Sequence, residues 1–258
     1  MRPGLALLPM AGIVLLLAGA MAAPPVEPRS GFSYLTPEMQ ALQDDDFANP
    51  GLLWVETGER LWSEPAGTSG QSCQDCHGDA ATSMTGVAAR MPAYSDELGR
   101  VINLEQQINQ CRQARQGAEP LEYESEDLLG LTAFVSHQSR GLPISVAVVG
   151  PAAESFKRGE AFFYQRRGQL NLSCANCHED NAGLHLRAET ISQGQTNGFP
   201  IYRALWQTMG SSHRMFAWCN EAVRAEPYAA GSQDYVDLEL FERWRSTGLT
   251  IETPAMRR

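Results

Sequence analysis

Two copies of one short motif hold four of the six cysteines in this chain. The motif is Cys-x-x-Cys-His, and it occurs at residues 73–77 and 174–178. Cysteines three positions apart lie on one face of a helix, where their thiols can join the two vinyl groups of a haem while the next histidine reaches the iron. A single copy could equally be a redox dithiol, a disulfide or half a zinc site, but two copies predict two covalently bound c-type haems. The predicted attachment residues are Cys73, Cys76, Cys174 and Cys177, and the predicted histidine ligands are His77 and His178.

Two cysteines remain, Cys111 and Cys219, one downstream of each motif and 108 positions apart. One interpretation is a disulfide between them, because idle thiols do not persist in an oxidising compartment. Their equivalent positions favour another, in which each gives a thiolate to the iron of its own haem, opposite the histidine. Such a ligand lowers the reduction potential of the haem and keeps a sulfur atom reactive. Methionine is the usual alternative ligand, but the available methionines do not repeat between the halves: Met84, Met91, Met209 and Met215.

A pair of basic residues directly precedes only one of the lone cysteines. His213 and Arg214 stand just before Cys219. The planar guanidinium of arginine pairs well with oxyanions, so Arg214 is a candidate to hold an anionic substrate. Holding a haem propionate is an equally good role for it. His185 follows the second motif and is expected near the edge or a propionate of that haem.

The chain carries the same order of elements twice. Gly58-Glu59 and Gly159-Glu160 precede the two motifs by the same distance, and each half closes with apolar residues at helical spacing, at 128–135 and 235–244. We therefore predict a mainly α protein with two tandem class I cytochrome c-like domains related by internal duplication. The predicted segments are a signal peptide at 1–22, an N-terminal extension at 23–50, and haem domains at 51–145 and 146–258.

Length, charge and the first residues restrict the location and the partners. The chain has 258 residues, enough for two domains of about 100 residues each. A net charge of −10 argues against a nucleic-acid partner. Arg2, an apolar run at 5–20 and the small residues of Ala20-Met21-Ala22 predict a cleaved secretory signal, and the run is short for a membrane anchor. The mature protein is expected in the periplasm, without a membrane span.

Several segments, in order from about residue 31 to the C-terminus, are similar to the SoxA family of bacterial sulfur oxidation. They include residues 45–55, 103–106, 169–174, 192–200 and 251–254. The resemblance implies the dihaem subunit of an L-cysteine S-thiosulfotransferase, which couples thiosulfate to a cysteine of the carrier SoxYZ and passes two electrons to c-type haem. It also implies a monohaem SoxX partner, a small c-type cytochrome as electron acceptor, and Cys219 as the catalytic cysteine.

One position departs from the family pattern. The family has a catalytic arginine four residues before the distal cysteine, and here that position is Met215. Arg214, five residues before Cys219, is therefore the predicted second catalytic residue. Either it reaches the site from a shifted backbone, or this protein handles its substrate poorly or differently. Two other functions also fit the residues: a dihaem thiosulfate dehydrogenase that forms tetrathionate, and a non-enzymatic electron carrier.

Overall fold

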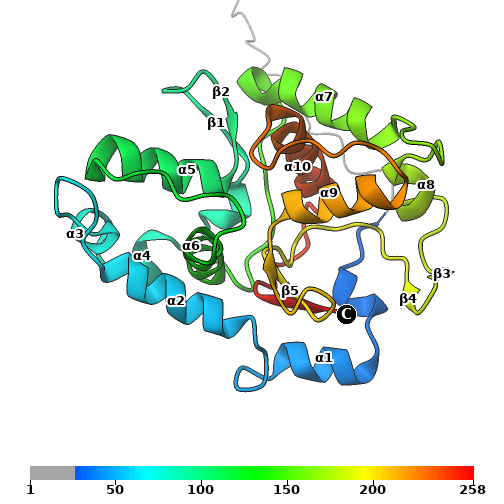
Figure 1. The fold of residues 1–258 in the computed structure, drawn as a ribbon, viewed down its shortest axis with the longest axis horizontal. Helices are drawn as coiled ribbons and strands as arrows, with labels where there is room; N and C mark the ends of the chain where they lie inside the picture. The colour runs from blue at the N-terminus through cyan, green and yellow to red at the C-terminus, as the bar shows by residue number, and fades with distance from the viewer. Residues whose placement is uncertain (1–26) are drawn as a thin grey trace, which may run out of the picture.

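The computed structural model describes residues 27–258 (Figure 1). The predicted signal peptide lies outside the described residues. Between residues 27 and 258 no helix combines the length and the apolar character needed to cross a membrane.

A pair of helices in close contact forms the frame of the first half. Helix α6 begins after Ser125, whose hydroxyl accepts a hydrogen bond from the Leu128 backbone N–H. Helix α2 lies against α6 at Gly58, where an added Cβ would overlap the carbonyl oxygen of Gly130. Glycine is therefore needed there for the two backbones to approach this closely. The helices of this half are η1 (Gly31–Tyr34), α1 (Pro37–Asp44), α2 (Leu52–Ser63), α3 (Cys73–His77), α4 (Ala80–Ser83), η2 (Ala88–Arg90), α5 (Leu104–Cys111), η3 (Arg112–Gln116) and α6 (Glu126–His137).

The second half uses a second close helix pair, α7 and α10. Gly159 of α7 lies against α10, and a Cβ there would overlap the carbonyl oxygen of Asp237. Tyr235, Leu238 and Phe241 of α10 are fully buried in the apolar core beneath α7. The helices of this half are η4 (Gly150–Ala152), α7 (Ala153–Tyr164), α8 (Cys174–His178), α9 (Ser212–Ala222) and α10 (Gln233–Arg245).

A short antiparallel hairpin leads into each helix that carries a lone cysteine. In the first half Ala93 pairs with Ile102, and in the second Ile201 pairs with Gly210, at positions 108 further along. The following helices, α5 and α9, are both capped by a side chain at an equivalent position, Asn103 and Ser211. The strands are β1 (Ala93–Ser95), β2 (Arg100–Ile102), β3 (His185–Leu186), β4 (Glu189–Thr190), β5 (Ile201–Arg203), β6 (Thr208–Gly210) and β7 (Ala255–Arg257), of which β6, β5 and β7 form one sheet with β5 and β7 parallel.

The two halves exchange parts of their cores. Val101 of β2 packs into the apolar cluster around α7 and α10, whereas Met209 of β6 packs into the cluster around α2 and α6. The segment after α6 also joins the end of the chain, because Ile144 N–H donates to the Leu249 carbonyl. The described part of the N-terminal extension packs against β7, where Gln43 Oε1 accepts from the Met256 backbone N–H at 2.9 Å. The halves are therefore interlocked.

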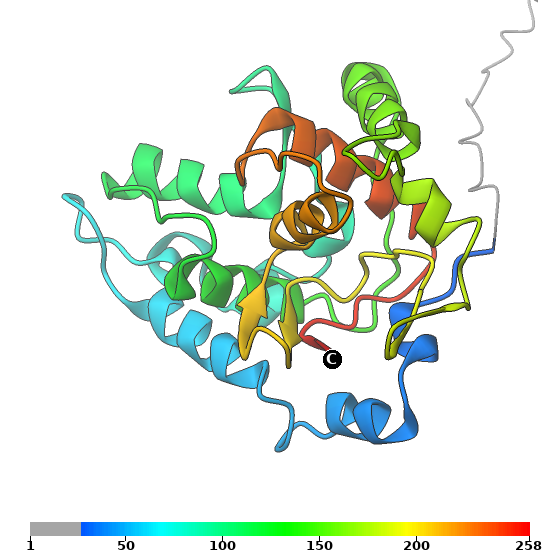
Figure 2. The same ribbon diagram turned by 45° about the vertical axis from the view of Figure 1, so that its right-hand side comes forward.

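Both views show α2 and α6 on one side of the molecule and α7 and α10 on the other, with α9 next to α10 (Figures 1 and 2). The prediction of a mainly helical protein is confirmed. The order of frame helix, CxxCH helix, hairpin, cysteine-bearing helix and closing helix is the same in each half. The internal duplication that this order suggests stays a prediction.

Candidate functional site

Both CxxCH motifs form a single helical turn with the same capping arrangement. Ser72 precedes α3, and its hydroxyl accepts from the Asp75 N–H while Asp75 accepts from the Ser72 N–H at 2.8 Å. Ser173 and Asn176 make the same reciprocal pair at α8. A capping box satisfies the first N–H groups of a helix that is too short to stabilise itself. Each pair of motif cysteines is thereby held on one turn.

The second motif histidine is prepared to bind a metal. His178 Nδ1 lies 2.8 Å from the Ser192 carbonyl oxygen, which can only accept, so Nδ1 carries the proton and the lone pair is on Nε2. A histidine that binds a metal usually donates its other ring N–H to a carbonyl in this way. Burial lowers the pKa of His178, which favours the neutral ring. Gly194 lies against this ring, and a Cβ there would come within 2.8 Å of Cγ. His77 is more exposed and packs against Trp62, with ring centroids 5.7 Å apart.

Each lone cysteine lies close to the CxxCH motif of its own half. All six cysteines are free thiols, so the disulfide between Cys111 and Cys219 is not formed. Burial raises the pKa of the Cys73 thiol, and the nearby Cys111 adds to the rise. In the second half burial raises the pKa of Cys174, and Cys219 contributes there in the same way. In the folded chain Cys111 is thus near the first CxxCH motif and Cys219 near the second, as the repeat pattern predicts.

The methionines considered as ligands have other neighbours. Met91 and Met209 are buried in the apolar cluster around α2 and α6, and Met84 packs against it. Met215 contacts a guanidinium: its Sδ lies 3.6 Å from Arg203 Nη1. The residues present fit a covalently attached haem in each half, with two thiols on one turn, a histidine and a nearby lone cysteine.

Arg214 does not share a helix face with Cys219. Helix α9 is continuous from Ser212 to Ala222, so the shifted backbone that we expected from the sequence is not observed. Residues five positions apart on a helix differ by about 140° in direction, whereas residues four apart lie on one face. Met215 therefore shares the face of Cys219. The Arg214 guanidinium instead donates to the Met209 carbonyl at 3.2 Å and lies 4.5 Å from the ring centroid of Trp206.

Arg203 of β5 is the residue that the sequence did not suggest. Its positive charge acts on Cys219 and lowers the pKa of that thiol, against the larger effect of burial, which raises it to about 11. The Cys219 side chain is nevertheless exposed to solvent. Protein atoms therefore surround its sulfur closely enough to disfavour the thiolate without closing off access to it. The Arg203 guanidinium lies 3.6 Å from the ring centroid of Trp218, the residue before Cys219. No local motif surrounds Arg203. The one signal in the sequence is the difference between the two repeats, which have Ser95 and Arg203 at equivalent strand positions.

Comparisons with known proteins identify the family. The model of the cytochrome c domain of SoxA/TsdA proteins matches residues 57–144. The L-cysteine S-thiosulfotransferase subunit SoxA of Rhodovulum sulfidophilum is 42% identical over 231 residues, which cover 90% of this chain and 80% of the relative. This chain belongs to the SoxA family. The SoxA subunit of Pseudaminobacter salicylatoxidans is 43% identical, covering 88% and 80% of the two chains.

A solved SoxA structure has the same fold. The crystal structure of SoxXA from P. pantotrophus superposes with a TM-score of 0.86 at 38% identity, covering 90% of this chain and 87% of that chain. The predicted family is confirmed. This SoxA-family chain is thus a c-type cytochrome with covalently bound haem c, and its relatives are named as subunits of an enzyme.

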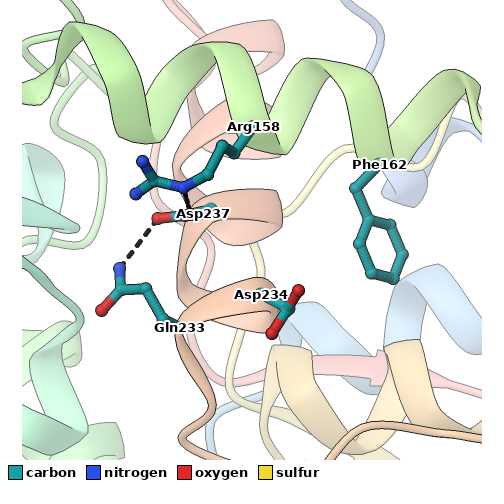
Figure 3. Close-up of a pocket in the computed structure, with 5 residues that line it drawn as sticks. All are labelled: Arg158, Phe162, Gln233, Asp234 and Asp237. Atoms are coloured by element: carbon teal, nitrogen blue, oxygen red, sulfur yellow. Dashed lines mark hydrogen bonds and ion pairs between the residues drawn. The ribbon is translucent and has the colours of Figure 1, made fainter.

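A cavity of about 250 Å³ lies between α7 and α10 (Figure 3). It is lined by Arg158, Phe162, Gln233, Asp234 and Asp237. Two of its polar side chains are bound to Asp237: Arg158 Nε lies 2.5 Å from Oδ2, and Gln233 donates to Oδ1 at 2.8 Å. The cavity contains no cysteine or histidine, and we assign it no part in the chemistry.

A buried polar cluster connects α5, α9 and α10. The Gly231 N–H donates to His213 Nδ1 at 2.9 Å, and His213 Nε2 lies 3.1 Å from Glu239 Oε2. Asn103 donates to the same Glu239 oxygen at 3.1 Å. Glu105 is buried beside this group. Its burial, together with the negative charge of Glu239, raises the pKa of Glu105 to about 8.

We predict that Glu105 makes the stability of this SoxA-family chain depend on pH. Because its pKa is higher in the folded than in the unfolded state, its contribution is complete below about pH 4.5 and is lost as the pH rises towards 8. The slope from one such group is at most about 1.4 kcal/mol per pH unit. Glu105→Gln should flatten the curve and give the more stable protein at pH 9, measured as the free energy of urea unfolding. Glu119→Gln, at an exposed position, is the control. A variant curve that parallels the parent from pH 5 to 9 would contradict the prediction.

Proposed function

We propose that this chain is the dihaem subunit of a periplasmic L-cysteine S-thiosulfotransferase, which joins thiosulfate to a cysteine of a SoxYZ-like carrier protein. The observation that carries the proposal is the position of Cys219 beside the second CxxCH motif, with Arg203 of β5 held against Met215 and Trp218 of the same helix. The named activity of the SoxA relatives, at 42% and 43% identity over most of the chain, supports it.

Two haems follow from the repeated arrangement. Cys73 and Cys76 would attach the first haem, with His77 and Cys111 as its iron ligands. Cys174 and Cys177 would attach the second, with His178 and Cys219 as its ligands. The free Nε2 of His178 and the closeness of each lone cysteine to its motif support these assignments. When bound, the haem supplies a centre that accepts electrons one at a time.

The residues around Cys219 suit the joining of two sulfur atoms. The outer sulfur of thiosulfate engages the Cys219 sulfur, and the carrier thiol approaches the same exposed position. A sulfur–sulfur bond forms between thiosulfate and carrier, the S–H bond of the carrier breaks, and one proton and two electrons leave. Arg214, over the ring of Trp206, would attract the thiosulfate dianion to this region.

The partners and the compartment belong to the same proposal. The structural neighbour is a SoxXA complex, which supports a SoxX-like monohaem partner for this chain. A small c-type cytochrome would take the electrons onward. The predicted signal peptide at residues 1–22 would direct the protein to the periplasm.

The proposal can be tested with the protein expressed together with its monohaem partner and purified with haem attached. We expect a mass corresponding to two haems on this chain, and a thiosulfate adduct on a carrier cysteine after incubation with thiosulfate and an oxidised cytochrome. Tetrathionate formed without any carrier would instead indicate a thiosulfate dehydrogenase. Fast reduction by small donors with no sulfur product would indicate an electron carrier.

A further inference from the structure

The two hairpin-and-helix units place different side chains beside their lone cysteines. In the first half Gln107, one helix turn before Cys111, donates from Nε2 to the cysteine sulfur at 3.4 Å. The equivalent position in the second half, 108 residues further on, is Met215, which has no N–H to donate. There the nitrogen donors come from the strand, because Arg203 of β5 reaches the Met215 side chain. The first-half equivalent of Arg203 is Ser95. Only the second half therefore has an arginine on the strand of its hairpin at this position; in the first half an arginine, Arg112, directly follows Cys111 in the chain.

The hydrogen bonds of Arg203 are incomplete. Its side chain is 5% exposed, and Nη2 lies 3.0 Å from both carboxylate oxygens of Glu189. Nη1 has only the weak sulfur acceptor of Met215, and Nε has no partner. A guanidinium has five N–H donors and no acceptor, and a buried donor without a partner costs about 1–3 kcal/mol. Such an arrangement is expected where a bound oxyanion supplies the missing hydrogen-bond acceptors.

The orientation of this guanidinium is held by its neighbours. Its carbon lies 3.6 Å from the ring centroid of Trp218 and 5.4 Å from that of Trp206. Glu189 holds one end from β4. Nη1 points to Met215, which shares a helix face with Cys219. Nη1 is therefore the donor without an oxygen partner that faces this part of α9, whereas the Nε–H lies on the opposite edge of the guanidinium, beside Nη2.

We propose that Arg203 is the residue that binds the substrate anion: its Nη1 group donates to a sulfonate oxygen of thiosulfate while the outer sulfur meets Cys219. The inference rests on the proposed function, which it deepens by naming the group that recognises the substrate. Arg203 replaces, from β5, the positive charge that Met215 cannot supply from α9. Glu189 competes with thiosulfate for the same guanidinium and so limits the affinity of the site for thiosulfate.

The test uses the complex with its haems attached. Thiosulfate binding, and binding of sulfate as an unreactive probe, would be measured by calorimetry, and KM and kcat by formation of the carrier adduct. Arg203→Gln should weaken thiosulfate binding and raise KM at least about 10-fold, with a smaller change in kcat. Arg203→Lys, which keeps the charge, should fall between this variant and the parent. Glu189→Gln should tighten binding of both anions several-fold, a result that a merely structural ion pair would not produce. Ser95→Ala, at the equivalent strand position, is the control and should bind like the parent.

The outcomes separate this inference from the proposed function. Unchanged anion binding in both Arg203→Gln and Glu189→Gln would overturn it. A shifted potential of the second haem in Arg203→Gln, with KM for thiosulfate unchanged, would show that the guanidinium serves a haem propionate and would also overturn it. If anion binding depends on Arg203 but no carrier adduct forms in the parent protein, the binding residue is correct and the transferase function is wrong.

Discussion

Replacing Cys219 with serine is expected to lower formation of the carrier adduct by at least about a thousandfold while both haems remain attached. Serine keeps the shape of the side chain but removes the sulfur atom on which covalent catalysis depends. The attachment cysteines are not touched, so the mass should still correspond to the parent protein with its haems. The rate of adduct formation on the carrier, followed by mass spectrometry, is the measurement.

The matched control is Cys111→Ser, in the other half. Cys111 has the same relation to its motif, but the strand position equivalent to Arg203 is Ser95, and the Cys111 sulfur receives a hydrogen bond from Gln107. We expect this variant to keep at least about a tenth of the parent rate, because the chemistry is assigned to the second half. Equal losses in the two variants would contradict that assignment, and full activity of Cys219→Ser would end the proposed mechanism.

The second large effect is expected at the crossing of α7 and α10. Gly159→Ala should lower the free energy of unfolding by about 2–4 kcal/mol, because the added Cβ would overlap the Asp237 carbonyl oxygen and Phe241 lies 3.0 Å from the same point. The sign of this change in the free energy of unfolding shows whether the position is crowded. At an uncrowded position within a helix the same change stabilises by about 1 kcal/mol. The measurement is urea unfolding of the protein with haem attached, followed by far-ultraviolet circular dichroism.

Two further variants make this result specific. Gly58→Ala, at the equivalent crossing of α2 and α6, should destabilise similarly, because its Cβ would overlap the Gly130 carbonyl oxygen. Glu160→Ala, the exposed neighbour of Gly159 on α7, should change stability by no more than about 0.5 kcal/mol. A gain in stability from Gly159→Ala would mean that the helices do not approach as closely as described.

The interlocked halves bear on how the protein folds. Val101 and Met209 hold equivalent positions in the two hairpins, and each is buried in the core of the opposite half. Either half alone would lose one of these contacts and expose the apolar surface that receives it. The boundary predicted at residue 145 therefore divides the repeat pattern, whereas the packing runs across it.

The chemistry that depends on local spacing could be predicted from the sequence. The CxxCH motifs, the glycine before each of them and the family resemblance needed only residues that are near neighbours along the chain. The family and the mainly helical cytochrome c character are confirmed, while the duplication, the count of two haems and the site residues stay predictions. Arg214 was chosen because it is near Cys219 in sequence, but its place on the helix turns it to another face.

What the tertiary structure alone decided is which distant groups meet. Arg203 of β5 meets Met215 and Trp218 of α9, and Glu189 reaches Arg203 from a separate hairpin. Glu105 and Glu239 share one buried cluster although they lie in different halves of the chain. Sequence patterns report side chains whose spacing follows the period of one helix or strand, whereas these contacts depend on how whole elements pack. Side-chain burial and charge pairing across elements have no local signature, and they emerge only once the chain is folded.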